Sequence, residues 1–179
     1  MIYVHLADGF EEIEAITIID VLRRANLETA SVSMTGDKSV RGAHDIWVDA
    51  DILFEKADYE RCDMIVLPGG MPGTMNLKAH AGLAGQIKDF ALAGKYLAAI
   101  CAAPLVLNAA GVLTDKNATI YPGMEEHLAG AKPQTDKVVK DGKIITSRGA
   151  GTAIEFSLTL VAVFLGQEKA DQMRKAMVA

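Results

Sequence analysis

The stretch Tyr96-Leu97-Ala98-Ala99-Ile100-Cys101-Ala102-Ala103-Pro104 decides the fold. Its first five residues form a continuous apolar run, which predicts a strand buried on both faces. Pro104 begins a predicted helix over residues 104–110, because proline is favoured in the first turn of a helix. Cys101 therefore lies on a sharp turn from strand to helix. A nucleophile on such a turn needs small neighbours, and alanines surround this one. A buried structural cysteine is an equally supported interpretation at this point.

Further apolar runs extend the pattern on both sides of this stretch. Ile2–Leu6 and Met64–Leu67 predict two more strands, and Pro68-Gly69-Gly70 ends the second. Residues with helical spacing predict helices over 12–25, 83–92, 152–165 and 168–178. Other extended segments are expected at 29–34, 46–48 and 118–121, and a hairpin joins 138–140 to 143–146 around Asp141-Gly142. Strands that alternate with helices predict an α/β sandwich with a mostly parallel sheet.

Length and composition set the class of protein. The 179 residues predict a single domain over 1–179, and 50% apolar residues supply a sizeable core, which excludes a disordered chain or a coiled coil. The net charge of −5, without a basic run, argues against nucleic acid or an anionic membrane as partner.

The two cysteines and the chain's start bear on compartment and membrane. Cys62 and Cys101 are too few for a disulfide framework and show no metal-ligand spacing, so we expect free thiols in a reducing cytoplasm and no metal. The start lacks the features of a signal peptide. Residues 96–114 carry no charge, but Pro104, Asn108 and Gly111 interrupt them, so we expect no membrane span.

In a parallel sheet the functional site lies at the carboxyl ends of the strands. The residues that follow Leu6, Leu67 and Ile100 are therefore the first candidates. Glycines after Leu67 could turn backbone N–H groups toward a ligand as an oxyanion hole does, although a simple turn is the more probable interpretation from sequence alone. Glu14 lies among apolar residues, but without the fold a solvated glutamate is the favoured interpretation. The four histidines have no assignable catalytic role.

Five sequence blocks together resemble the ThiJ/PfpI superfamily, in the branch that contains the Parkinson's-disease-associated protein deglycase and its bacterial relatives. The blocks cover nearly the whole chain and occur in the family's order. They are Ala7-Asp8-Gly9-Phe10-Glu11-Glu12-Ile13-Glu14, Asp20-Val21-Leu22-Arg23-Arg24-Ala25, Val66-Leu67-Pro68-Gly69-Gly70, Ala98-Ala99-Ile100-Cys101-Ala102-Ala103-Pro104 and Thr146-Ser147-Arg148-Gly149-Ala150-Gly151-Thr152. The resemblance implies a flavodoxin-like three-layer sandwich with a nucleophile elbow, no cofactor and a homodimer.

The resemblance also implies roles for single residues. Cys101 is then the reactive cysteine and Glu14 the glutamate that hydrogen-bonds it, while Gly70 and Ala102 provide the oxyanion-hole N–H groups. Three further positions match the family's pocket with weaker standing, namely Arg24, Ser147 and, as a basic residue contributed across the dimer, His44.

Two departures from the family pattern stand out. Tyr121 occupies the position where close relatives have a histidine before a proline. The protease branch has its catalytic histidine directly after the cysteine, where this chain has Ala102, so the resemblance does not extend to peptidase activity.

Two functions follow as hypotheses. The first is a cysteine-dependent, cofactor-free enzyme that acts on small dicarbonyls such as methylglyoxal, or on glycated substrates, as a glyoxalase or deglycase. The second is a non-enzymatic redox sensor or stress chaperone in which the same cysteine is oxidised. In either case Cys101 is expected to react before Cys62, with a thiol pKa lowered by the nearby helix N-terminus.

Overall fold

The centre of the protein is a seven-stranded sheet, seen in a computed structural model that describes residues 1–179. Its strands are β1 (Ile2–Leu6), β2 (Thr29–Ser33), β5 (Ile52–Leu53), β6 (Met64–Leu67), β7 (Tyr96–Ile100), β10 (Val138–Asp141) and β11 (Ile144–Ser147). They are arranged in the order β10-β11-β7-β6-β1-β2-β5. All neighbours are parallel except β10 and β11, which form an antiparallel hairpin.

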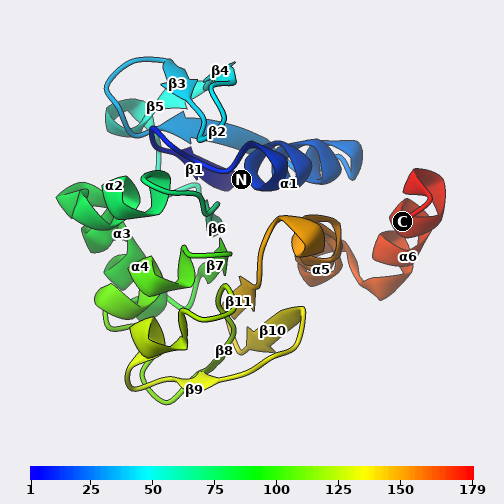
Figure 1. Ribbon diagram of the computed structural model, residues 1–179. Coiled ribbons are helices and arrows are strands. Elements are labelled where there is room, and N and C mark those ends of the chain that lie inside the picture. Colours follow the sequence, from blue (N-terminus) through cyan, green and yellow to red (C-terminus); the bar gives the residue numbers. More distant parts are fainter.

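Helices cover both faces of this sheet (Figure 1). Three lie on one side, namely α2 (Gly73–Ala79), α3 (Ala81–Leu92) and α4 (Pro104–Ala109). On the other side lie α1 (Glu12–Arg24) and α5 (Ala153–Leu165), with α6 (Gln167–Met177) packed on α5. Short 3-10 helices occupy Phe54–Lys56, Glu125–Leu128 and Ala150–Thr152. The predicted three-layer α/β sandwich is confirmed.

Alternation along the strands divides the interior into two cores. Val4 and Ile100 belong to the core beneath α1 and α5. Their neighbours Tyr3 and Ala99 belong to the core beneath α2, α3 and α4. Successive side chains of a strand point to opposite faces, so a strand buried on both sides is apolar throughout. This explains why the central strands appear in the sequence as unbroken apolar runs.

The order of the strands places the site. From β1 the chain continues to β2 on one side, and later returns to β6 on the other side. The crevice at such a reversal, outside the carboxyl ends of the strands, is where ligands bind in open α/β sheets. The segments that follow β1, β6 and β7 meet there.

Several sequence-based predictions of elements need correction. The extended piece expected at 46–48 is one arm of a hairpin, β3 (Ser39–Arg41) with β4 (Trp47–Asp49). Neither α2 nor β5 was predicted. The two-residue turn of the β10–β11 hairpin is formed by Gly142 and Lys143, one residue later than expected.

The strand expected at 118–121 is wrong beyond its first residue. Only β8 (Asn117–Ala118) forms, paired with β9 (Lys132–Pro133). The backbone N–H of Thr119 instead donates to the Thr146 hydroxyl, 2.9 Å away, and that of Tyr121 donates to the Cys101 carbonyl, 2.8 Å away. These bonds to the neighbouring strand ends replace a strand ladder.

None of the helices combines the length and the apolar character that crossing a bilayer requires. Residues 96–114 are divided between β7, the turn at Cys101, α4 and the turns that follow it, as the interruptions in their sequence predicted.

Packing of α5 against α1 is expected to carry much of the stability. Phe156 of α5 is fully buried in the core that α1 shares. Phe156→Ala should lower the free energy of unfolding by about 3–5 kcal/mol, because it leaves a cavity. The control Ile154→Ala changes a residue of the same helix that is 41% exposed, and should cost less than about 1 kcal/mol. Urea denaturation of both variants measures the difference, and equal losses would contradict this account of the core.

Candidate active site

Cys101 lies on a strained turn directly after β7. Its φ of +63° is in the left-handed region that non-glycine residues rarely adopt. The turn is held from two sides: the Cys101 N–H donates to the Ser147 carbonyl at 3.0 Å, and the Cys101 carbonyl accepts from the Tyr121 N–H at 2.8 Å. Such backbone strain persists only where surrounding bonds determine it, and it is common at reactive sites. The nucleophile elbow expected in the fold is therefore present.

Glu14 faces this elbow from the first turn of α1. Its side chain is fully buried, and the Gly69 N–H donates to its Oε2 atom at 2.8 Å. Its Oε1 atom is buried without a hydrogen-bond partner. Burial raises the pKa of Glu14 to about 7, against the opposing effect of the Gly69 N–H. Near neutral pH the group can therefore both give and take a proton.

Gly69 lies close to both the Glu14 carboxyl and the Cys101 side chain. A Cβ atom on Gly69 would lie 2.6 Å from Cys101 Cβ and 2.9 Å from Glu14 Oε2. Only glycine leaves room for both groups at this position. The sequence drew attention to the Gly-Gly turn for its possible N–H donors, but not to Gly69 as the residue that holds Glu14.

The thiol of Cys101 does not have the lowered pKa that the sequence suggested. Burial first, and then the negative charge of Glu14, raise the pKa of Cys101 to about 12. The N–H groups of Ala102 and Gly70 act in the opposite direction. Protonation of Glu14 removes the repelling charge, so the two residues titrate as a coupled pair that shares a proton.

The resemblance to the family assigns the oxyanion donors to the N–H groups of Gly70 and Ala102. Gly70 has a φ of +90°, and a side chain on it would collide with the backbone of Gly9 and Glu11. Ala102 follows the elbow directly and is buried. Both N–H groups lower the pKa of the Cys101 thiol, so they favour its ionised form.

Tyr121 and Ser147 adjoin the elbow through their backbones. The Tyr121 side chain is half exposed, and its ring lies against Gly149, where an added Cβ would be 3.4 Å away. The buried Ser147 hydroxyl is occupied elsewhere, because it donates to the Lys137 carbonyl at 2.6 Å and contacts the Thr152 hydroxyl at 2.7 Å.

Arg24 is not brought to the site within this chain. It lies at the other end of α1, ten residues beyond Glu14, or about 15 Å along a helix. Its guanidinium is exposed and pairs with Asp20, 2.6 Å away on the same helix.

His44 lies in the β3–β4 hairpin, against the start of α1 of its own chain. Its Nδ1 atom is 2.8 Å from Glu12 Oε2 and 3.8 Å from Glu11 Oε2. Ligand atoms of these three residues lie within 4.8 Å of one another, so they are the residues whose geometry could hold a metal ion. Sequence spacing could not reveal the group, because the hairpin that brings His44 to Glu12 joins residues far apart in the chain. Glu12 and His44 already satisfy each other by hydrogen bonds.

The remaining histidines lie away from this arrangement. His5 is fully buried in β1, where its Nε2 atom lies 2.8 Å from the Tyr59 hydroxyl. Burial lowers the pKa of His5 to about 4, so it is neutral. His80 begins α3, and its ring accepts from the Leu83 N–H.

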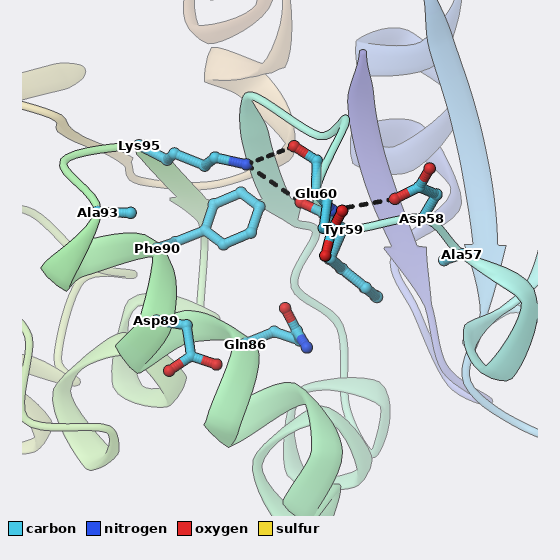
Figure 2. Close-up of a pocket in the computed structure, with 9 residues that line it drawn as sticks. All are labelled: Ala57, Asp58, Tyr59, Glu60, Gln86, Asp89, Phe90, Ala93 and Lys95. Atoms are coloured by element: carbon cyan, nitrogen blue, oxygen red, sulfur yellow. Dashed lines mark hydrogen bonds between the residues drawn. The ribbon is translucent and has the colours of Figure 1, made fainter.

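A cavity of about 520 Å³ lies elsewhere, between α3 and the loop that precedes β6 (Figure 2). Lys95 at its rim is the residue before β7, whereas Cys101 follows β7 at the opposite edge of the sheet. The Lys95 ammonium is engaged by the carbonyls of Tyr59, Glu60 and Cys62. A second cavity, of about 280 Å³, is lined by residues that include Gly9 after β1 and Pro72 after β6.

Comparison with known proteins identifies the family. The family model described as "DJ-1/PfpI family" matches residues 1–163. Protein DJ-1 homolog B of Arabidopsis thaliana is 39% identical over 98% of this chain, which spans only 40% of that protein's length. The glutathione-independent glyoxalase DJR-1.2 of Caenorhabditis elegans is 33% identical over 93% of this chain and 89% of its own length.

A solved structure, "Toxoplasma gondii DJ-1, oxidized", superposes with a TM-score of 0.95 and 36% identity, covering 99% of this chain and 97% of that one. With Cys101 on its elbow, Glu14 opposite it, and the family model matched along most of the sequence, this chain belongs to the DJ-1/PfpI family.

Proposed function

We propose that this protein is a cysteine-dependent, cofactor-free enzyme of the glyoxalase or deglycase type, acting on reactive dicarbonyls such as methylglyoxal. The observation that carries the proposal is the fully buried carboxyl of Glu14, with a pKa of about 7, beside the Cys101 elbow. A general acid–base group is most effective when its pKa is close to the working pH. The sulfur supplies the nucleophile, and two N–H groups flank it.

The reaction follows from these groups. The Cys101 sulfur attacks the aldehyde carbon, and its proton passes by way of Glu14 to the aldehyde oxygen, which gives a hemithioacetal. While negative charge develops on that oxygen, the N–H groups of Gly70 and Ala102 stabilise it. Glu14 then moves the aldehyde-carbon proton to the neighbouring carbon through an enediol, which leaves a thioester. Water hydrolyses the thioester, so that methylglyoxal plus water gives lactate and the free thiol.

The relatives support this choice of chemistry. A protein 33% identical to this chain over nearly its whole length is named a glutathione-independent glyoxalase. Early glycation adducts, which release or contain the same carbonyl groups, are a second substrate class for the same site. Ala102 directly after the cysteine gives no imidazole for a protease-type dyad. Two free thiols fit a cytoplasmic location.

Lactate formation tests the role of the cysteine. Supplied with methylglyoxal, without glutathione and with a chelator present, the protein should produce lactate. Cys101→Ala should lose this turnover because it removes the nucleophile. Cys62→Ala is the matched control: Cys62 is fully buried and its thiol donates to the Met64 carbonyl, whereas Cys101 is partly exposed. Lactate that persists in Cys101→Ala would rule out the mechanism.

Glu14→Gln tests the acid–base group. Gln keeps an oxygen for the Gly69 N–H but cannot carry a proton between atoms, so turnover should fall by 10²–10⁴-fold, the typical worth of acid–base catalysis. The inflection near pH 7 in the wild-type pH–rate profile should vanish as well. Wild-type kinetics in Glu14→Gln would exclude Glu14 as the proton shuttle.

The same variant has a readout in stability. The folded-state pKa of Glu14 is above its unfolded value, so its favourable contribution is complete below about pH 4 and is lost as the pH rises through 7. Glu14→Gln removes this titration. Between acidic pH and pH 8, the free energy of unfolding of the wild type should therefore fall by up to about 3 kcal/mol more than that of Glu14→Gln. Above pH 8 the two proteins should show the same pH dependence. Urea denaturation at pH 5 and pH 8 measures this.

A redox sensor is the second candidate function. Its support is the buried Glu14 carboxyl, which as a proton donor could hold a sulfinate on Cys101, and a relative whose solved structure is described as oxidized. Two peroxide molecules convert the thiol to sulfinic acid and release two waters. If peroxide adds two oxygen atoms to Cys101 readily and methylglyoxal gives no lactate, this function replaces the first.

A homodimer is part of the proposal. Ile13 and Ile16 of α1 are 59% and 43% exposed, and Trp47 of the neighbouring hairpin is 62% exposed. A second copy of the chain would cover such an apolar face. Light scattering should give twice the mass of the chain. Ile13→Lys with Ile16→Lys should give a monomer, whereas Leu92→Lys, at an isolated 88% exposed position on α3, should remain dimeric. A wild-type monomer at micromolar concentration would contradict the proposal.

A further inference from the structure

A buried hydrogen bond ties the segment before β6 to the middle of the sheet. His5 of β1 is fully buried, and its Nε2 atom lies 2.8 Å from the Tyr59 hydroxyl. Its Nδ1 atom lies 3.3 Å from the Val66 carbonyl oxygen of β6. A carbonyl oxygen can only accept, so Nδ1 carries the proton of the neutral ring, and Nε2 accepts from the Tyr59 O–H.

Tyr59 anchors the segment 57–63, which joins the 3-10 helix at Phe54–Lys56 to β6. Its ring stacks on that of His5, with the centroids 6.0 Å apart and the planes inclined by 19°. Further aromatic contacts join it to Tyr3, Phe54 and Phe90. Tyr59 also lines the cavity of about 520 Å³ between this segment and α3 (Figure 2). The shape of the cavity therefore depends on where the Tyr59 side chain is held.

The backbone of the same segment has a separate attachment. The Lys95 ammonium donates to the carbonyls of Tyr59, Glu60 and Cys62, at 3.1, 2.9 and 2.7 Å. These three bonds use all the ammonium protons, and none of them involves His5. A change at His5 would therefore act on the Tyr59 side chain and leave the end of the segment next to β6 attached.

A protonated His5 does not fit this arrangement. Its ring would donate from both nitrogens, so the Tyr59 hydroxyl would have to accept from Nε2 and turn its own proton away. That hydroxyl makes no other hydrogen bond within the chain. The closed arrangement would then contain a buried cation and an unsatisfied O–H group, and both are costly away from water.

No carboxylate compensates a charge on His5. The titratable groups that face its ring are Tyr59, Tyr3 of the same strand and His80 at the start of α3. Burial lowers the pKa of His5 to about 4; the Val66 carbonyl opposes this effect, and the charge of His80 adds to it. The next groups contact or act on Tyr59 or Tyr3 instead, and they are Glu55, Asp58, Arg61, Cys62 and Lys95.

We propose that the His5–Tyr59 hydrogen bond is an acid-sensitive latch: protonation of His5 releases the Tyr59 side chain and opens the segment 57–63 over the cavity beside α3. Neutral pH keeps the latch closed. The device is independent of the proposed function, because Cys101 lies at the opposite edge of the sheet from this cavity.

The direction and size of the effect follow from linkage. A histidine that opening exposes to water has a pKa near 6.5, whereas His5 in the closed form has a pKa of about 4. The closed form is therefore fully favoured above pH 6.5 and loses this advantage as the pH falls through that interval. From pH 6.5 to pH 4 the equilibrium constant for opening should rise about tenfold per pH unit, or about 300-fold in all.

Hydrogen–deuterium exchange followed by mass spectrometry between pH 7 and pH 4 tests the latch, after correction for the intrinsic exchange rates. The amides of Ala57 and Cys62 are hydrogen-bonded within the segment and report on it. Peptides that cover 54–63 should lose protection by about 10²-fold as the pH falls. Peptides that cover β7 should remain protected.

Two variants change the latch in opposite ways. His5→Gln keeps an acceptor for the Tyr59 O–H and cannot be protonated, so the loss of protection at acidic pH should disappear. Tyr59→Phe keeps the ring and removes the hydroxyl, so the neutral His5 loses its donor and is more easily protonated. Its loss of protection should begin about 0.5–1 pH unit higher than in the wild type.

His127→Gln is the matched control, because His127 is half exposed and lies 3.9 Å from Glu126, and it should exchange as the wild type does. Equal exchange profiles for the wild type, His5→Gln and Tyr59→Phe would overturn the latch. Loss of protection in β7 at the same pH as in 54–63 would also overturn it, since the whole fold would then open together. Exchange does not require turnover, so these results are separate from those of the lactate assay.

Discussion

Two backbone hydrogen bonds at Cys101 are the constraint on which the site depends. The Ser147 carbonyl and the Tyr121 N–H hold the residue in a left-handed conformation that a cysteine would not adopt alone. β7 and β11 are parallel neighbours, so the end of β11 reaches the end of β7 in register, and Ser147 lies opposite Ile100. The strain at the elbow, which is typically worth about 1–3 kcal/mol, is thus sustained by the sheet itself.

The second constraint is electrostatic. A buried carboxyl is costly when ionised, and Glu14 has one hydrogen-bond donor in Gly69 and one oxygen without a partner. A site that kept Glu14 permanently charged would surround it with donors or a cation. Here a single donor, the Gly69 N–H, stabilises the Glu14 carboxylate only partly. The proton therefore stays available for transfer to and from the neighbouring sulfur. The same repulsion keeps the thiol protonated whenever the carboxyl is ionised, so neither group acts alone.

The sequence predicted the fold well where burial is strongest. Ile2–Leu6, Met64–Leu67 and Tyr96–Ile100 are apolar on both faces, and their bounds in the structure agree with the predicted ones. The sequence did not predict short elements, because strands of two or three residues such as β5 have no periodic pattern of apolar residues. The strand predicted over residues 119–121 was wrong for another reason. The N–H groups of Thr119 and Tyr121 donate to residues at or just after the ends of other strands, and no local sequence pattern reveals such bonds.

The candidate site could be predicted less completely. The turn at Cys101 was visible because a buried strand and a helix start meet there. The pKa of its thiol was not, since it depends on burial and on Glu14, which is distant in the chain. Arg24 lies ten residues beyond Glu14 on α1, so within one chain its position keeps it away from Glu14. The partnership of His44 with Glu12 depends on a hairpin that the sequence only half revealed.

The bond from Tyr121 to Cys101 uses the backbone of residue 121, and this separates two properties of that position. The N–H maintains the elbow, while the half-exposed side chain is free of that task. Evolution or an engineer can therefore exchange the side chain at 121 without rebuilding the turn, and proline is the one residue that the position excludes, because it has no N–H to donate. The fold therefore fixes the position of the residue 121 backbone beside Cys101, while the chemistry of the side chain at this position can vary.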